Sequence, residues 1–102
     1  MSYSSPAAAP VLNILTIDLE DYFHPTEVQA SAPQKSWPRL PSRVQTATRR
    51  VLEILARHSV RATFFVLGWV ARRHPTLIRE IAAAGHEIAC HSFTHRLVFD
   101  LT

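Results

Sequence analysis

The stretch VRATFFVLG (60–68) decides the fold of this chain. It is a short apolar run, rich in branched and aromatic residues, and Gly68 ends it. A run of this kind is typical of a strand that is buried on both faces, as strands of parallel sheets are. Two further runs, VLNILTID (11–18) and HEIAC (86–90), predict two more such strands on either side of it along the chain.

Helical patterns fill both intervals between the predicted strands. Ser42 and Gln45 match a capping box, and apolar residues then recur at helical spacing, so we expect a helix from there to about residue 58. A second helix is expected to begin at Pro75 and to end before Gly85, where a left-handed cap is favoured. Alternating strands and helices predict an α/β fold with right-handed β-α-β crossovers and a parallel sheet.

Residues 22–41 contain four prolines and many small polar residues, which predicts a long loop. A loop of this length in a small domain is usually functional or disordered. We interpret Trp37 as an anchor that packs the loop down, with stacking on a sugar as the alternative. His24 is a weak candidate for lining a site, and we expect His58, His74 and His86 at the surface or in loops.

The composition indicates one small globular domain, since 47% of the 102 residues are hydrophobic. The net charge of +3 comes from dispersed arginines rather than from a basic block, so we expect no nucleic-acid partner. No apolar stretch reaches the roughly 18 residues of a membrane span. The single Cys90 excludes an internal disulfide, and we expect it to face the core.

The first residues carry no secretory signal pattern, because a positive segment and a separate hydrophobic block are both absent from MSYSSPAAAPVLNILTID. We therefore expect residues 1–10 to be a disordered lead-in and the protein to be cytoplasmic.

Acidic residues follow the first predicted strand in TIDLEDYFH (16–24). Asp18 and Glu20 are two apart, so a continuing strand would place them on one face, and Asp21 would point away unless the backbone turns. Two neighbouring carboxylates repel each other, which favours a cation between them or a role for one as a base.

Histidines follow the third predicted strand in HSFTH (91–95). His91 and His95 converge if residues 92–95 form a helical turn. Because parallel strands end at the same edge of a sheet, we expect both clusters to meet there. Two imidazoles and a carboxylate suit Zn²⁺, Fe²⁺, Co²⁺ or Ni²⁺. With a free carboxylate as base, this set predicts metal-assisted hydrolysis of an amide or ester.

TIDLEDYFH (16–24), WPRLPSRV (37–44) and the stretch from residue 60 to residue 95 resemble the polysaccharide deacetylases of the NodB homology class, carbohydrate esterase family 4. The chain looks most similar to the subgroup found at exosortase and exopolysaccharide loci, and the resemblance covers residues 12–102. It implies a metal-dependent hydrolase that removes N-acetyl groups from a polysaccharide of N-acetylhexosamines. It also implies one divalent metal ion, expected to be zinc, with cobalt, nickel or iron as alternatives.

The resemblance assigns roles to individual residues. Asp18 matches the base that activates water, and His91 and His95 match the two metal histidines. The family usually has two adjacent aspartates where this chain has DLED, so the third metal ligand differs from the family pattern. The position of Glu20 on the same face as Asp18 makes Glu20 the expected ligand, with Asp21 the alternative.

The family fold is a distorted (β/α)7-type barrel, so residues 11–102 would form its amino-terminal β-α-β-α-β portion, truncated at the C-terminus. The later family motifs, which include a leucine-x-histidine that supplies the acid, have no counterpart in this sequence. We therefore expect little or no activity from the chain alone. The alternative hypothesis is a non-catalytic fragment that binds glycan or protein.

Overall fold

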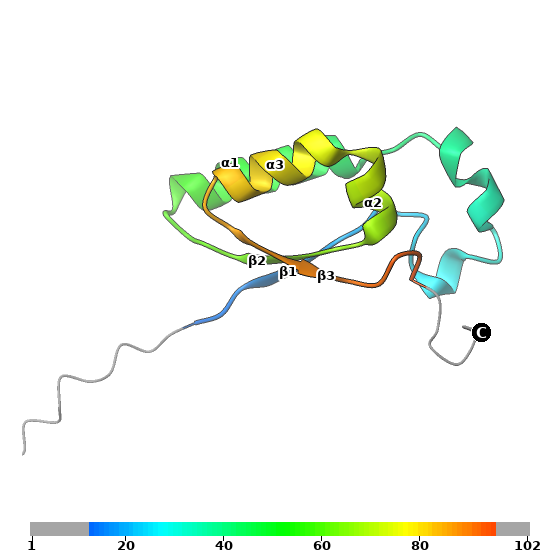
Figure 1. Cartoon of the computed structure of the whole chain (residues 1–102), viewed down its shortest axis with the longest axis horizontal. Coiled ribbons are helices and arrows are strands. Elements are labelled where there is room, and N and C mark those ends of the chain that lie inside the picture. The colour runs from blue at the N-terminus through cyan, green and yellow to red at the C-terminus, as the bar shows by residue number, and fades with distance from the viewer. Residues whose placement is uncertain (1–12, 96–102) are drawn as a thin grey trace, which may run out of the picture.

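The computed structural model describes residues 13–95, which form a three-stranded sheet with helices on one face (Figure 1). The predicted lead-in at residues 1–10 lies outside the described residues. The elements are β1 (Thr16–Leu19), the 3₁₀ helices η1 (Thr26–Val28) and η2 (Gln34–Arg39), α1 (Val44–Arg57), β2 (Thr63–Val66), α2 (Gly68–Arg73), α3 (Pro75–Ala83) and β3 (Glu87–Cys90). The predicted α/β class with strand–helix alternation is confirmed.

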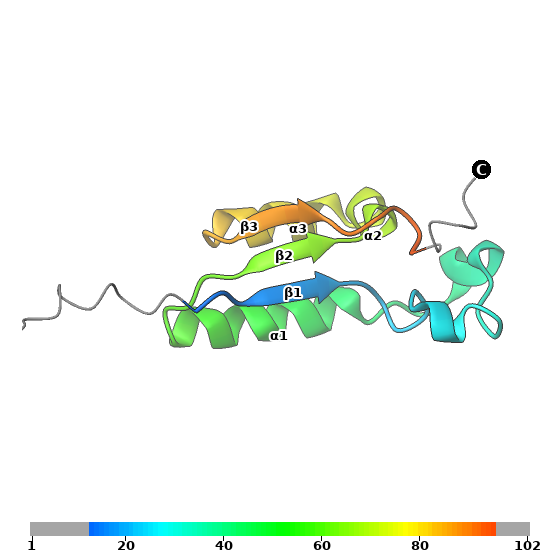
Figure 2. The same ribbon diagram turned by 90° about the horizontal axis from the view of Figure 1, so that it is seen from below.

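The three strands are parallel and lie in the order β1-β2-β3, so their carboxyl ends meet at one edge of the sheet (Figure 2). Asp18 pairs with Phe65, and Phe65 pairs with Ala89, which places these three residues on one face. Leu19 and Val66 are paired on the opposite face. The register therefore separates an open face, which carries Asp18, from a helix-covered face.

The hydrophobic core lies between the helices and the covered face of the sheet. Its buried members come from β1, from β2 and the residues flanking it, and from α1, α2 and α3; they are Leu19, Val44, Leu55, Ala62, Phe64, Val66, Leu67, Val70, Leu77 and Ile81. Replacing a fully buried residue such as Phe64 with alanine would cost about 3–5 kcal/mol. The predicted burial of the strands on both faces is wrong for the described residues, because no described element covers the face that carries Asp18 (Figure 1).

The helix boundaries agree with the sequence at Pro75 and Gly85 and differ from it at two other points. Pro75 begins α3, and Gly85 follows it with a φ of 92°. The Gly85 N–H donates to the Ala82 carbonyl at 3.0 Å, which completes the predicted left-handed cap. The short helix α2 was not predicted from the sequence. The predicted capping box is wrong, because α1 begins at Val44 with no side-chain cap from its own first residues.

The loop between β1 and α1 folds around Trp37, as the anchor interpretation predicts. Trp37 is fully buried, and its Nε1–H donates to the Ala32 carbonyl at 2.8 Å. Its ring packs edge-on against those of His24 and Trp69, with centroids 4.5 and 5.5 Å away. This burial excludes stacking of Trp37 on a sugar. The two 3₁₀ helices give the loop regular structure where the sequence predicted none.

Two side chains lie differently from what the sequence alone suggests. His86 lies in the loop before β3, within the predicted surface or loop positions, but it is buried, and its Nδ1 accepts the Ala62 N–H at 3.0 Å just before β2. Cys90 is exposed rather than in the core, although its partner Val66 is buried on the helix-covered face, because β3 is an edge strand among the described residues. Within residues 13–95, no helix has the length and apolar character needed to cross a bilayer.

Candidate metal centre

Glu20, His91 and His95 come together at the carboxyl edge of the sheet. Each offers one ligand atom, and these atoms all lie within 4.8 Å of one another. Glu20 directly follows β1 and His91 directly follows β3, so the two segments reach across the end of β2. Because β2 lies between them, β1 and β3 are roughly 10 Å apart. The predicted meeting of the acidic and histidine clusters is nevertheless what the structure shows.

The two histidines converge by a different route from the predicted helical turn. Ser92 and His95 have φ values of 61° and 62°, so the backbone enters the left-handed region twice between Cys90 and the end of the described residues. The imidazole centroids lie 5.0 Å apart with planes at 81°. A helical turn has no such positive φ values, and the prediction of one over residues 92–95 is wrong.

The first residues of α2 hold this histidine loop in place. The backbone N–H of Gly68 donates to the Ser92 carbonyl at 2.8 Å, and that of Trp69 donates to the Phe93 carbonyl at 3.0 Å. These N–H groups have no partner inside their own helix, since the first turn of a helix leaves them free. The loop therefore obtains its shape from the strand–helix junction beside it and not from its own sequence alone.

Two polar atoms of the cluster are buried without a hydrogen-bond partner in the described part of the chain. They are Oε2 of Glu20 and Nδ1 of His91. The carboxylate oxygen of Glu20 also lies 3.5 Å from Nε2 of His95. Leaving such atoms unsatisfied costs about 1–3 kcal/mol each, which a cation between them would offset for the carboxylate. Two imidazoles and one carboxylate also match the donor preference of zinc and similar divalent ions.

Asp21, the alternative third ligand, is engaged elsewhere. Its carboxylate is buried and accepts the backbone N–H groups of Arg43 at 3.1 Å and Val44 at 3.4 Å. The Ser42 hydroxyl donates to it as well. These contacts place Asp21 at the N-terminus of α1, where a carboxylate interacts favourably with the helix dipole. Glu20, not Asp21, is therefore the carboxylate that the structure brings to the histidines.

Asp18, the candidate base, lies outside the three-residue cluster but close to it along the chain. It is an exposed residue of β1 on the open face of the sheet. Asp18 and Glu20 both line a hollow of about 150 Å³ beside α1. Asp18 is thus accessible to solvent near the end of β1 from which Glu20 enters the cluster.

His24 lies behind the cluster and supports it structurally. It is fully buried, and its Nδ1 accepts the Asp21 N–H at 2.7 Å. Burial lowers the pKa of His24 to about 4, because the charged imidazole loses its hydration, while the Asp21 carboxylate acts in the opposite direction. His24 is therefore neutral near pH 7 and belongs to the packed loop, not to the lining of the site as the sequence had suggested.

Thr26 and Gln29 touch the histidine loop and were not singled out in the sequence. The Thr26 hydroxyl lies 3.1 Å from Nδ1 of His95, and the Gln29 side-chain amide donates to the Thr94 carbonyl at 3.4 Å. The contact between Thr26 and His95 joins residues 69 positions apart. No local pattern signals such a contact, so only the folded arrangement reveals it.

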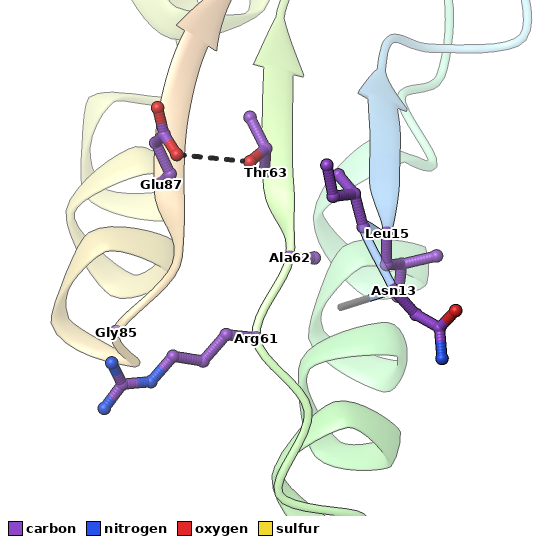
Figure 3. A pocket seen from close by; sticks show the side chains of 8 residues that line it. Asn13, Leu15, Arg61, Ala62, Thr63, Gly85 and Glu87 are labelled. Atoms are coloured by element: carbon purple, nitrogen blue, oxygen red, sulfur yellow. Dashed lines mark hydrogen bonds between the residues drawn. The ribbon is translucent and has the colours of Figure 1, made fainter. Parts of the chain in front are cut away.

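Another hollow, of about 530 Å³, lies at the opposite end of the strands (Figure 3). Arg61, Gly85 and Glu87 line it, and the Thr63 hydroxyl donates to Glu87 at 3.3 Å. It holds none of the candidate catalytic residues. In folds of alternating strands and helices, chemistry gathers at the carboxyl ends of the strands, so this hollow is not the functional site.

Comparison with known proteins places the chain among deacetylases. A sequence model described as polysaccharide deacetylase matches residues 36–102. A chitooligosaccharide deacetylase of Rhizobium leguminosarum bv. trifolii is 52% identical over 48 residues, which are 47% of this chain and 22% of that protein. A peptidoglycan-N-acetylglucosamine deacetylase of Bacillus cereus is 42% identical over 48 residues, which are 47% of this chain and 18% of that protein. The matched segment thus spans about a fifth of these relatives.

Solved structures show the same fold over most of the chain. The peptidoglycan deacetylase PdaC from Bacillus subtilis superposes with a TM-score of 0.61 at 25% identity, covering 87% of this chain and 33% of that one. A second structure, from Mycobacterium smegmatis, gives a TM-score of 0.63 at 31% identity and covers 87% of this chain and 32% of that one. The sheet and helices described above therefore correspond to about a third of each larger protein.

Proposed function

Because this chain belongs to the polysaccharide deacetylase family, we propose that it forms the metal-binding part of a hydrolase that removes N-acetyl groups from a polymer of N-acetylhexosamines. The relatives named above act on chitooligosaccharides and on the N-acetylglucosamine of peptidoglycan, which supports an N-acetylated sugar as the substrate. The finer assignment to an exopolysaccharide rests on the resemblance of the sequence to the subgroup at exosortase and exopolysaccharide loci.

The clustering of Glu20, His91 and His95 is the observation that carries this proposal. Three ligands from the protein leave further positions of an ion open to water and substrate, as catalytic zinc sites require. Zinc is the ion we propose, with cobalt, nickel and iron as alternatives of similar ligand preference. Such an ion, when bound, polarises the acetamide carbonyl and makes water more acidic.

The remaining catalytic roles are assigned to residues of this chain. We assign Asp18 as the base that takes a proton from the attacking water, because it matches the family's base in TIDLEDYFH and is exposed on the open face of the sheet, two residues before Glu20. Glu20, His91 and His95 hold the ion. Water adds its oxygen to the acetyl carbon, the carbon–nitrogen bond breaks, and acetate and a free amine leave. The proton that the amine needs on leaving must come from an acid, for which the described residues offer no assigned group.

Metal binding tests the proposal directly. The chain is stripped of metal, titrated with zinc by isothermal calorimetry, and its metal content is measured by elemental analysis. We expect one ion per chain, with binding lost in His91→Ala and Glu20→Gln. His58→Ala is the matched control, because His58 is exposed at the end of α1 and distant in sequence from the cluster. Absence of stoichiometric metal in the wild-type chain would contradict the proposal.

Acetate release from N-acetylglucosamine oligomers tests the chemistry separately. Activity above that of a chelated sample, lost in Asp18→Asn while zinc binding persists, would support Asp18 as the base. A chain that binds zinc and oligomer but releases no acetate would instead support the fragment hypothesis, in which this part of the family fold serves binding alone.

A further inference from the structure

The Thr26 side chain contacts both the ring and the backbone of His95. No other side chain in the described part of the chain does so. The Thr26 hydroxyl oxygen lies 3.1 Å from Nδ1 of His95 and 3.3 Å from the His95 carbonyl oxygen. We propose that Thr26 is a positioning residue that fixes the tautomer of His95, so that Nε2 is the ring nitrogen available to a metal ion. This inference rests on the proposed function of the cluster.

The hydrogen-bond inventory of the two groups decides the tautomer. A hydroxyl has one hydrogen and two lone pairs, whereas a carbonyl oxygen can only accept. Because the carbonyl can only accept, both contacts are hydrogen bonds together only when the Thr26 hydroxyl donates to the His95 carbonyl and accepts from the ring. The hydrogen of the neutral imidazole therefore sits on Nδ1, and Nε2 carries the free lone pair.

The surroundings of Nε2 agree with this assignment. Nε2 of His95 lies 3.5 Å from Oε2 of Glu20, a carboxylate oxygen that has no hydrogen-bond partner among the described residues. A lone pair facing a carboxylate is unfavourable unless a cation lies between them. With the opposite tautomer, Nε2–H would point at Glu20 and exclude an ion. Thr26 thus favours the arrangement that binds metal over the one that pairs with Glu20.

The contact between Thr26 and the His95 carbonyl also stabilises an unfavourable backbone conformation at His95. His95 has a φ of 62°, a conformation that costs a non-glycine residue about 1–3 kcal/mol unless its surroundings enforce it. Thr26 holds the carbonyl of His95, and Gln29 joins the carbonyls of His24 and Thr94 at 3.0 and 3.4 Å. The segment from Thr26 to Gln29 therefore stabilises the conformation of the histidine loop through these hydrogen bonds, in addition to connecting β1 and α1.

Two substitutions separate the hydroxyl from the shape of the side chain. Thr26→Val keeps the branched shape and removes both hydrogen bonds, whereas Thr26→Ser keeps the hydroxyl. Ligating histidines that lose such a partner typically lose about 10–100-fold in metal affinity, so we expect that loss for Thr26→Val and near wild-type affinity for Thr26→Ser. Thr46→Val, on the exposed side of α1, is the matched control and is expected to bind zinc normally.

Nitrogen-15 NMR of the histidine side chains gives a second readout that needs no metal. In the metal-free wild-type chain we expect the hydrogen of His95 on Nδ1, and in Thr26→Val a shift toward Nε2. A wild-type His95 protonated on Nε2 overturns the inference, even if Thr26→Val fails to fold. Equal zinc affinity in wild type and Thr26→Val also overturns it, while leaving the proposed function intact. If the wild type binds no zinc, the proposed function fails, and the NMR result still decides the role of Thr26.

Discussion

The carboxylate of Asp21 accepts the backbone N–H of Arg43 at 3.1 Å, although the two residues are 22 positions apart. The loop that follows β1 thereby caps the first turn of α1. Glu20, the adjacent acid, points its carboxylate into the histidine cluster instead. Two neighbouring acids thus have separate tasks, one in stability and one in the candidate metal centre.

Substitution of these two acids should separate stability from metal binding. Asp21→Ala leaves the N–H groups of Arg43 and Val44 without their acceptor, so we expect the free energy of unfolding to fall by about 1–3 kcal/mol. Glu20→Gln removes a partly buried carboxylate whose Oε2 has no hydrogen-bond partner among the described residues, so the metal-free chain should be at least as stable as wild type. Urea unfolding in chelator measures both changes. Greater destabilisation by Glu20→Gln than by Asp21→Ala would contradict this division.

A methyl group at Gly68 should disturb the metal centre at a distance. A Cβ there would lie 2.5 Å from Cδ2 and 3.2 Å from Cα of Phe93, which stands between the two histidines in the loop. The exposed ring can rotate away, but the backbone contact requires the loop to shift. We therefore expect Gly68→Ala to weaken zinc binding by roughly tenfold or more, as losses in supporting contacts do. Calorimetry with zinc measures the effect.

Gly85→Ala is the matched control for that substitution. Gly85 has a φ of 92°, so alanine there is strained, but its nearest contact is the Arg61 side chain at the far end of the sheet. We expect lower stability with unchanged zinc affinity. The double substitution Gly68→Ala with Phe93→Ala should recover little of the affinity, because the contact with the Phe93 backbone remains. If Gly68→Ala binds zinc as wild type does, the loop is not held by the α2 junction.

The buried His24 should make stability fall in mild acid. Its pKa in the folded chain is about 4, below the value of 6.5 in the unfolded chain. As the pH falls from 6.5 to 4, His24 is protonated in the unfolded state but still neutral in the folded state. The free energy of unfolding therefore decreases across that range. The loss can reach about 3 kcal/mol at the usual 1.36 kcal/mol per pH unit. Above pH 6.5 both states are neutral and His24 has no effect.

Urea unfolding between pH 4 and pH 7.5, in chelator, measures this dependence. His24→Asn keeps an acceptor for the Asp21 N–H and should give a flatter profile than wild type. His58→Asn, at an exposed position, should follow the wild-type profile. A wild-type slope that persists in His24→Asn would assign the acid sensitivity to another group.

Cys90 should react in the folded chain. Its side chain is exposed at the end of β3, so a thiol reagent such as Ellman's reagent should label it without denaturant. Cys90→Ser should leave the free energy of unfolding within about 0.5 kcal/mol of wild type, as surface substitutions usually do. Labelling only after unfolding would show that Cys90 is covered.

Sequence patterns predicted the features that depend on near neighbours in the chain. The alternation of strands and helices, the positions of Pro75 and Gly85, and the packing role of Trp37 all follow from local spacing and residue type. The meeting of Glu20 with the histidines followed from topology, since parallel strands end at one edge.

Features that depend on distant contacts were not predictable in the same way. The shape of the histidine loop depends on N–H groups of Gly68 and Trp69, which belong to an unpredicted helix. Glu20 was already the expected ligand, but the contact that engages Asp21 at the start of α1 joins it to Arg43, 22 positions away. The exposure of Cys90 depends on which strand lies at the edge of the sheet. In each case the decisive partner lies far away in the sequence.

The cluster reaches across the end of β2 to join two strands that do not hydrogen-bond with each other. An ion held there would cross-link the ends of β1 and β3, so that local unfolding of one strand would require the loss of the ion from the other. At a hundred times its dissociation constant it would add about 2.7 kcal/mol to stability. On addition of zinc, amide hydrogen exchange should then slow in both β1 and β3. The ion would in that case stabilise the fold as well as take part in catalysis.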